Sequence, residues 1–335
     1  SDVFIVAGRP VSFRKNGLIH KIDDDRLLPQ HTDALLHEIY TLAENRDFSR
    51  LAAEGDDDFS FALPGVSRFR VSAFKQRGSL SAVIRVISFS LPDAKEQGIP
   101  KQIIDFADFS KGLVLVTGPA GSGKSTTLAC VIDHINQTRH EHIITLEDPL
   151  EFLHRHNKSI VSQREISVDT VSYVTALRAS LRQSPDVILL GEMRDYETIT
   201  VAMTAAETGH LLFSSLHTVG AANTVDLILD VFPPNQQHQI AVQLAMVLQA
   251  VVSQQLLPTV DGGLMPAFEV MAVNPAIRNM IRENKIHQID TVIAASAEEG
   301  MVSMDASILN LYRAGRISDR TALTYAANPD LLAKK

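Results

Sequence analysis

The sequence predicts an α/β protein in which a parallel sheet, covered by helices, follows a smaller α+β domain. Beyond residue 100, short apolar runs without alternation indicate strands that are buried on both faces. Before residue 90, apolar residues alternate with polar ones, as in antiparallel strands with one solvated face. A length of 335 residues agrees with two domains. The four apolar runs are 113–117, 143–146, 187–190 and 211–215.

The first domain is expected over residues 1–90, and the polar, proline-containing segment 91–100 is the expected linker. A helix is expected over 32–45, because its apolar residues recur at helical spacing and Thr32 can cap it. The acidic run Asp56–Asp58 is interpreted as a solvated turn. Strands are expected at 3–6, 11–14, 17–19, 59–63, 67–76 and 80–87.

The second domain is expected over residues 101–335, and its last part, from about Asn235, is predicted to be helical. Within that part, Ile240–Val260 carries no formal charge. A membrane-spanning helix needs about 20 mostly apolar residues, whereas this stretch includes several glutamines and a proline. We interpret it as a buried amphipathic helix rather than as a membrane span.

Composition and charge restrict the class of protein. Hydrophobic residues make up 45% of the chain and charged residues 21%, which is ordinary for a globular protein. The net charge of −8 disfavours electrostatic binding to nucleic acid or anionic lipid. The single cysteine, Cys130, excludes an internal disulfide and a cysteine-rich zinc site, and the N-terminus lacks a signal-peptide pattern. We therefore expect a protein of a reducing compartment, without zinc and without a nucleic-acid partner.

A phosphate-binding loop is the strongest motif. Residues 118–125 fit G-x4-G-K-[ST], between an expected strand at 112–117 and an expected helix at 126–136. Glycines let the backbone curl around phosphate, and the N-terminus of the following helix adds partial positive charge. Lys124 is expected to bridge the β- and γ-phosphates of ATP, and the Ser125 hydroxyl to ligate Mg2+. The expected nucleotide-binding residues are Gly118, Ala120, Gly121, Ser122, Gly123, Lys124, Ser125 and Thr126.

Polar residues follow three of the apolar runs. Glu147–Glu151 follow 143–146, Glu192 follows 187–190, and His217 follows 211–215. An isolated glutamate after a strand is more often a helix cap or a surface charge. In an open parallel sheet, however, ligands bind at the carboxyl ends of the strands. Together with the phosphate loop, these residues predict a phosphoryl-transfer site in which Glu192 orients water and contacts Mg2+, partly through water.

Other charged residues have weaker assignments. Arg70 and Arg85 of the first domain, with Arg68 and Arg77, are candidates to contact the γ-phosphate, and solvation on a strand surface explains them equally well. Two pairs of histidines lack acidic or thiol neighbours at zinc-binding spacing. We interpret them as exposed side chains that bind no metal. These are His140 with His142 and His154 with His156.

Four segments together resemble the secretion ATPase superfamily, and most closely its PilT-type pilus retraction ATPases. In order, they are similar to the Walker A motif, Asp box, Walker B motif and His box: 118–125, 145–152, 189–195 and 208–218. The resemblance covers nearly the whole chain. It implies a RecA-like ATPase domain, a PAS-like N-terminal domain, a ring-shaped homohexamer, and ATP bound between the domains. It also implies that Glu192 and Glu151 are the catalytic carboxylates, and that His210 and His217 sense nucleotide and couple subunits.

The segment 274–283 resembles the AIRNLIRE motif of retraction ATPases. Asn274 is expected to cap this helix, its apolar residues to face the core, and Arg278 and Arg282 to share another face and serve coupling. Extension ATPases of the superfamily usually carry a four-cysteine zinc element, which a single cysteine excludes.

The resemblance also implies an inner-membrane pilus platform protein as partner and a location at the cytoplasmic face of that membrane. The sequence departs from the family pattern in three places, so an accessory paralogue of the PilU type remains an alternative. A RecA-type nucleic-acid motor and a non-catalytic adaptor are the others, although the charge and the complete motifs disfavour them. The departures are Phe4, Gln183–Asp186 and Leu227.

Overall fold

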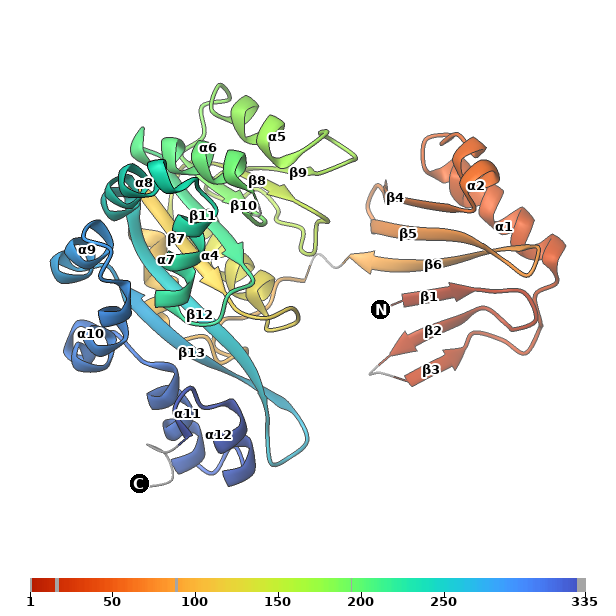
Figure 1. Ribbon diagram of the computed structural model, residues 1–335. Helices are drawn as coiled ribbons and strands as arrows, with labels where there is room; N and C mark the ends of the chain where they lie inside the picture. The colour runs from red at the N-terminus through yellow and green to blue at the C-terminus, as the bar shows by residue number, and fades with distance from the viewer. Residues whose placement is uncertain (1, 16–17, 88–89, 194, 330–335) are drawn as a thin grey trace. The chain divides into compact units, whose positions relative to one another are not determined.

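The computed structural model describes residues 2–15, 18–87, 90–193 and 195–329. The chain forms two compact units (Figure 1). The first comprises Ser1–Ser90 together with the short segment Leu150–Leu153, and the second comprises Leu91–Pro149 and His154–Lys335. In the described residues, no helix is long and apolar enough to cross a membrane.

In its described residues, the first unit is an antiparallel sheet with two helices. Its described strands follow the order β3-β2-β1-β6-β5-β4, and every neighbouring pair is antiparallel. The α+β class predicted for this part of the chain is confirmed. Leu36, Leu51 and Val71 lie at its core with 0% exposure. The elements are β1 (Asp2–Ile5), β2 (Ser12–Lys15), β3 (Leu18–Lys21), α1 (Pro29–Leu42), α2 (Ser49–Glu54), β4 (Asp56–Leu63), β5 (Ser67–Gln76) and β6 (Ser79–Ile87).

The acidic run Asp56–Asp58 begins strand β4, so the predicted solvated turn is wrong. Asp57 is 2% exposed, and its carboxylate accepts hydrogen bonds from the Arg46 guanidinium (2.9 Å) and the Tyr40 hydroxyl (2.8 Å). These donors lower the pKa of Asp57 against the opposing effect of its burial, which is the largest single influence. Tyr40 comes from α1 and Arg46 from the loop after it, so the sequence around Asp57 does not show that these hydrogen bonds offset the cost of its burial.

The second unit is built on a sheet whose described strands follow the order β13-β12-β7-β11-β10-β8-β9. All neighbours are parallel except β12 and β13, which confirms the predicted α/β class. Helices lie on both sides of the sheet (Figure 1). The strands are β7 (Gly112–Thr117), β8 (His142–Glu147), β9 (Ile160–Glu165), β10 (Val187–Leu190), β11 (Leu211–Leu216), β12 (Leu248–Pro258) and β13 (Leu264–Ala272).

The pleat of β7 explains its unbroken apolar run. Leu113 and Leu115 face one hydrophobic cluster, and Val114 and Val116 face another on the opposite side of the sheet. The helical elements that enclose these clusters or follow the sheet are α3 (Lys101–Ile104), η1 (Asp105–Asp108), α4 (Lys124–Thr138), α5 (Tyr173–Ser180), α6 (Tyr196–Glu207), α7 (Ala221–Asp230), α8 (Pro234–Val247), α9 (Pro275–Arg282), η2 (Ile286–Gln288), α10 (Ile289–Ala295), η3 (Ala297–Glu299), α11 (Met304–Arg313) and α12 (Asp319–Tyr325).

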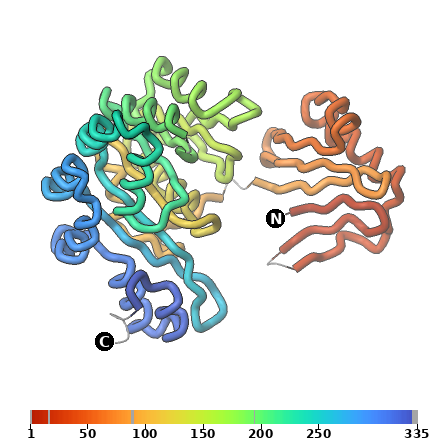
Figure 2. Tube along the Cα trace, viewed as in Figure 1, coloured from red at the N-terminus to blue at the C-terminus, as the bar shows by residue number. Residues whose placement is uncertain are grey.

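The predicted helix over Ile240–Val260 is wrong. Helix α8 ends at Val247, and the chain continues as β12, which lies between β7 and β13 (Figure 2). A strand buried on both faces shows no alternation, so periodicity alone cannot separate it from a buried helix. The prediction that the chain is helical beyond Asn235 therefore fails for β12 and β13 and holds for α8 and for the helices after β13.

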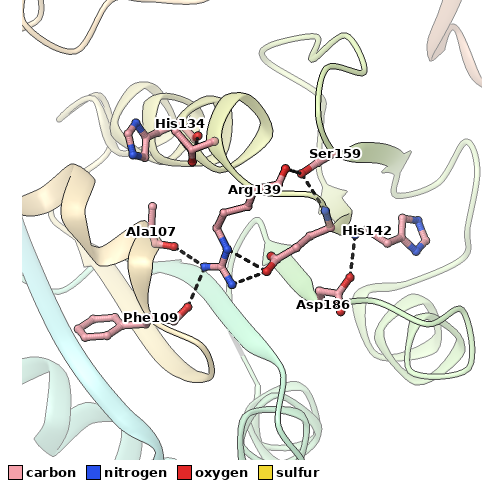
Figure 3. Close-up of polar contacts among 9 residues, drawn as sticks. Ala107, Phe109, His134, Arg139, His142, Ser159 and Asp186 are labelled. Carbon is pink, nitrogen blue, oxygen red and sulfur yellow. Dashed lines mark hydrogen bonds and ion pairs between the residues drawn. The ribbon is translucent and has the colours of Figure 1, made fainter.

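Arg139 joins three segments at the amino ends of the parallel strands (Figure 3). Its guanidinium donates hydrogen bonds to the carbonyls of Ala107 (2.5 Å) and Phe109 (2.8 Å), and it pairs with the Glu141 carboxylate. The carbonyl of Arg139 accepts from the Ser159 hydroxyl at 2.7 Å. This cluster ties the segment before β7 to the connection between α4 and β8.

Candidate active site

The phosphate loop connects the end of β7 to the start of α4. Gly118, Gly121 and Gly123 have φ angles of +139°, +75° and +89°, which favour glycine. At Gly118, a Cβ atom would lie 2.1 Å from the carbonyl oxygen of Gln254 on β12. Glycine is therefore required there by close backbone contact as well as by conformation.

Lys124 is the first residue of α4 and is 8% exposed. Its ammonium group donates to the carbonyl oxygens of Gly118 and Pro119, both at 2.9 Å, so the cation lies against the loop. Ser125 and Thr126 are half-buried in the first turn, and Ala120 is exposed. A buried lysine at a helix N-terminus beneath a glycine-rich loop fits an anionic phosphate chain.

Two hydroxyl groups near the loop support the same fit. In the described residues, Thr117 Oγ1 and Ser122 Oγ are buried without a hydrogen-bond partner. Buried polar groups in native proteins are nearly always paired, so such oxygens are suited to a ligand or to its bound water. The donor set of hydroxyl oxygens and carboxylates also suits Mg2+.

Glu192 and His217 come together at the carboxyl ends of neighbouring strands. Glu192 follows β10 and is 8% exposed, and His217 follows β11, which lies between β10 and β7. His217 Nε2 lies 3.4 Å from Glu192 Oε2. The ends of β10 and β11 are also joined by a hydrogen bond from the Ser215 hydroxyl to the Gly191 carbonyl (2.6 Å). Because β7 is the next strand, this pair lies at the same sheet edge as the phosphate loop.

Strand β12 and its partner β13 hold the segment after His217. The Ser253 hydroxyl accepts from the backbone N–H of Gly220 at 2.9 Å. Opposite Ser253, the carboxylate of Glu269 accepts from the first N–H of α7, at Ala221, at 2.7 Å. Burial raises the pKa of Glu269, while this backbone donor opposes the shift. The hairpin thus fixes the start of α7 directly after the His box.

Two glutamates at and after the end of β8, Glu147 and Glu151, belong to different units. Glu147 ends β8, and its carboxylate accepts from the Thr145 hydroxyl (2.6 Å) and the Gln163 amide (3.3 Å). Glu151 is exposed and lies in Leu150–Leu153, which belongs to the first unit. Lys124, Glu192 and His217 all belong to the second.

Arg70 and Arg85 also lie in the first unit, where they are directly opposite each other on β5 and β6. The Arg85 guanidinium donates to Asp2 Oδ1 at 2.8 Å. This hydrogen bond raises the pKa of Arg85 and lowers that of Asp2. Arg85 nevertheless keeps 64% of its side chain exposed, so its remaining donors can reach a ligand.

His210 lies at the opposite end of β11 from this site, so its assignment as a nucleotide-binding residue stays a prediction. It lies just before β11, where its carbonyl accepts from Gly112 N–H (3.0 Å) and its Nδ1 contacts the Ala205 carbonyl (2.9 Å). Since β7 and β11 run parallel, His210 is about one strand length, roughly 20 Å, from the phosphate loop of the same chain.

Two of the four histidines predicted to be exposed are not. His142 is half-buried, with Nε2 2.9 Å from the Ser162 hydroxyl and Nδ1 3.0 Å from the Gln183 carbonyl. His154 is half-buried, and burial lowers its pKa to about 4. Both residues are bonded to β9, His142 through Ser162 and His154 through Gln163. The sequence pattern predicted no strand there, so it could not predict their partial burial. His140 and His156 are exposed as expected.

The AIRNLIRE-like segment forms α9 largely as predicted. Asn274 Oδ1 accepts from Ile277 N–H at 3.0 Å, and Ile277 and Ile281 are fully buried. The two arginines differ, however. Arg278 donates to the Ala245 carbonyl near the end of α8 (2.5 Å), whereas Arg282 is exposed. The two arginines are four residues apart on α9, as the prediction of a shared helix face requires, but only Arg278 is held by backbone carbonyls.

The fold and the site define a P-loop ATPase with a mostly parallel sheet. Residues 1–284 match the family model described as "Type II/IV secretion system protein". The chain belongs to this family of secretion ATPases.

Three similar proteins narrow the relationship. The "Type IV pilus retractation ATPase PilT" of Pseudomonas aeruginosa is 43% identical over 330 residues, covering 98% of this chain and 95% of that protein. The "Type IV pilus ATPase PilU" of the same organism is 38% identical and covers 97% of this chain and 85% of its own length. A crystal structure of the pilus retraction motor PilT with bound ADP has a TM-score of 0.91 and 44% identity. It covers 100% of this chain and 95% of its own.

Proposed function

We propose that this chain is the motor ATPase that drives type IV pilus retraction, and hence twitching motility. The observation that carries the proposal is the joint position of the phosphate loop, Glu192 and His217 at one sheet edge. The chain is also similar over nearly its whole length to a pilus retraction ATPase, with higher identity to PilT (43%) than to PilU (38%).

In the proposed reaction, the residues of the second unit position ATP and water. The loop N–H groups and Lys124 hold the β- and γ-phosphates, and Glu192 orients the attacking water. Mg2+, held by the Ser125 hydroxyl and by Glu192 through water, neutralises phosphate charge when it is bound. His217, within reach of Glu192, is placed to respond to the presence of the γ-phosphate.

The first unit supplies the remaining charged groups in this proposal. Arg70 and Arg85 lie on adjacent strands and give the unit a pair of cations for the γ-phosphate. Glu151 acts as the second catalytic carboxylate. We further propose a homohexamer at the cytoplasmic face of the inner membrane, where ATP turnover moves the two units and turns the pilus platform protein.

Two substitutions test the catalytic assignment. Lys124→Ala and Glu192→Ala should each abolish ATP hydrolysis, because they remove phosphate neutralisation and water orientation. Both should leave the size of the assembly in gel filtration unchanged. Lys158→Ala changes an exposed lysine in the loop before β9 and serves as the control. Unchanged turnover in either site variant would refute the assignment.

The biological assignment needs a separate experiment, since PilU is also similar to this chain. The gene should restore pilus retraction and twitching in a strain that lacks its retraction ATPase. Restoration only in a strain that lacks a PilU-type protein would instead favour the accessory role. Purified protein without ATPase activity under any condition would favour a non-catalytic adaptor.

A further inference from the structure

Gln254 of β12 lies directly beside the phosphate loop. Its neighbour Ser253 is opposite Thr117, the last residue of β7, so Gln254 lies level with the first loop residue. Its side chain is 2% exposed. Burial of a primary amide is costly unless its polar atoms are hydrogen-bonded, so its partners reveal what holds it there.

Both ends of the Gln254 amide are bonded to the nucleotide-binding segment. Nε2 donates to the carbonyl oxygen of Ser122 in the loop at 2.6 Å. Oε1 accepts from the hydroxyl of Thr127, in the first turn of α4, at 2.8 Å. Thr127 is itself 0% exposed. One side chain therefore joins the loop and the helix that follows it.

The hydrogen bond to Ser122 fixes the direction of a peptide unit. A trans peptide is planar, and its C=O and N–H groups point in opposite directions. With the Ser122 carbonyl turned toward Gln254, the N–H of Gly123 points away from β12. Backbone N–H groups that point inward from such a loop are what bind phosphate. Rotation of this peptide would replace a donor with a carbonyl oxygen, which repels phosphate.

The fit around the amide is tight. A Cβ atom at Gly123 would lie 2.8 Å from Gln254 Nε2, and a Cβ at Gly118 would lie 2.1 Å from the Gln254 carbonyl oxygen. Two glycines of the motif are thus matched to this one residue. The loop cannot shift toward β12, and the amide prevents the 122–123 peptide from rotating.

We propose that Gln254 is a positioning residue for nucleotide binding, which holds the Gly123 N–H toward the phosphates through the Ser122 carbonyl. The inference rests on the nucleotide site of the proposed function. It predicts a specific effect on affinity, because Gln254 acts on the loop in the ground state and Glu192 acts on the water. Loss of the amide should therefore change KM far more than kcat.

The test uses Gln254→Met in the full-length chain, which keeps the side-chain volume and removes both hydrogen bonds. We expect the Kd for ADP, measured by calorimetry, and the KM for ATP to rise about tenfold, as loss of a buried hydrogen bond implies. The kcat should fall less than about threefold. Gln255→Met, on the same strand and pointing to the opposite face, is the matched control and should leave both constants unchanged.

A second variant, Thr127→Val, still tests the proposal if Gln254→Met does not fold. Thr127→Val removes the hydroxyl bonded to Gln254 Oε1 without changing shape, and it should raise the Kd for ADP about threefold. An unchanged Kd in either folded variant, even with a lowered melting temperature, would overturn the proposal and leave a purely structural role. Wild-type protein that binds ADP without hydrolysing ATP would refute the motor function, while these affinities would still decide the role of Gln254.

Discussion

Replacement of Arg139 by methionine should destabilise the second unit by about 3 kcal/mol. Methionine keeps an aliphatic stem of similar length, so the change removes polar contacts rather than packing. Those contacts are two carbonyls, of Ala107 and Phe109 (Figure 3), and the carboxylate of Glu141. The variant leaves all three acceptors without their donor.

The magnitude follows from the burial of this cluster. The side chains of Arg139 and Glu141 are only 22% and 18% exposed. Removal of one partner from a buried ion pair costs about 3–5 kcal/mol, and each hydrogen bond to a charged group contributes about 1.5–3 kcal/mol. Because the cluster is partly exposed, water can hydrogen-bond to some of the acceptors that lose Arg139. We therefore expect a loss of stability near the lower end of the 3–5 kcal/mol range, about 3 kcal/mol.

Urea unfolding followed by circular dichroism measures the effect. The control is Lys101→Met, which removes an ion pair to Asp105 whose side chains are 86% and 42% exposed, and which should cost at most about 0.5 kcal/mol. Adding Glu141→Gln to Arg139→Met should restore part of the stability, because no carboxylate is then left unpaired. A loss below about 1 kcal/mol, or one equal to that of the control, would refute the reasoning.

Two further predictions concern His154 and α9. Burial lowers the pKa of His154 from an ordinary 6.5 to about 4. Between these two pH values the unfolded chain binds a proton at His154 and the folded chain does not. Stability should therefore fall as pH drops from about 6.5 to 4, by up to about 3 kcal/mol, and His154→Gln should flatten that part of the unfolding curve; an unaltered pH profile would contradict this. Arg282→Ala should spare folding and ATP turnover but stop twitching, whereas Arg278→Ala should also lower the melting temperature because Arg278 binds carbonyls near the end of α8. Normal motility of the Arg282 variant would exclude a coupling role.

Much of the fold could be predicted because its signals are local. The phosphate loop is a contiguous motif, and the strands β7, β8, β10 and β11 are apolar runs that had no competing interpretation. Lys124 follows from the phosphate-loop motif, and Glu192 and His217 follow from the rule that ligands bind at the carboxyl ends of parallel strands.

The features that the sequence did not predict share a physical cause: their structure depends on residues that are distant in sequence. The sequence of β12 shows no alternation of apolar and polar residues, because both faces of the strand are buried. Gln254 was missed because its stretch was assigned to a helix, and its bonding partners lie more than a hundred residues earlier. The carbonyls that hold Arg278 lie near the end of α8, more than thirty residues before it. None of these constraints is visible in a short window of sequence.

The position of β12 also has a consequence for the synthesis of the protein. β7 is flanked by β11 and β12, so its final neighbour is made about 130 residues after it. Pairing over such a separation is slow because the intervening chain must first be ordered. A ribosome-bound chain that ends before β12 holds every residue of the glycine-rich motif but lacks the strand that supports it. We expect nucleotide affinity to appear late in translation, only when residues beyond Pro258 have left the exit tunnel.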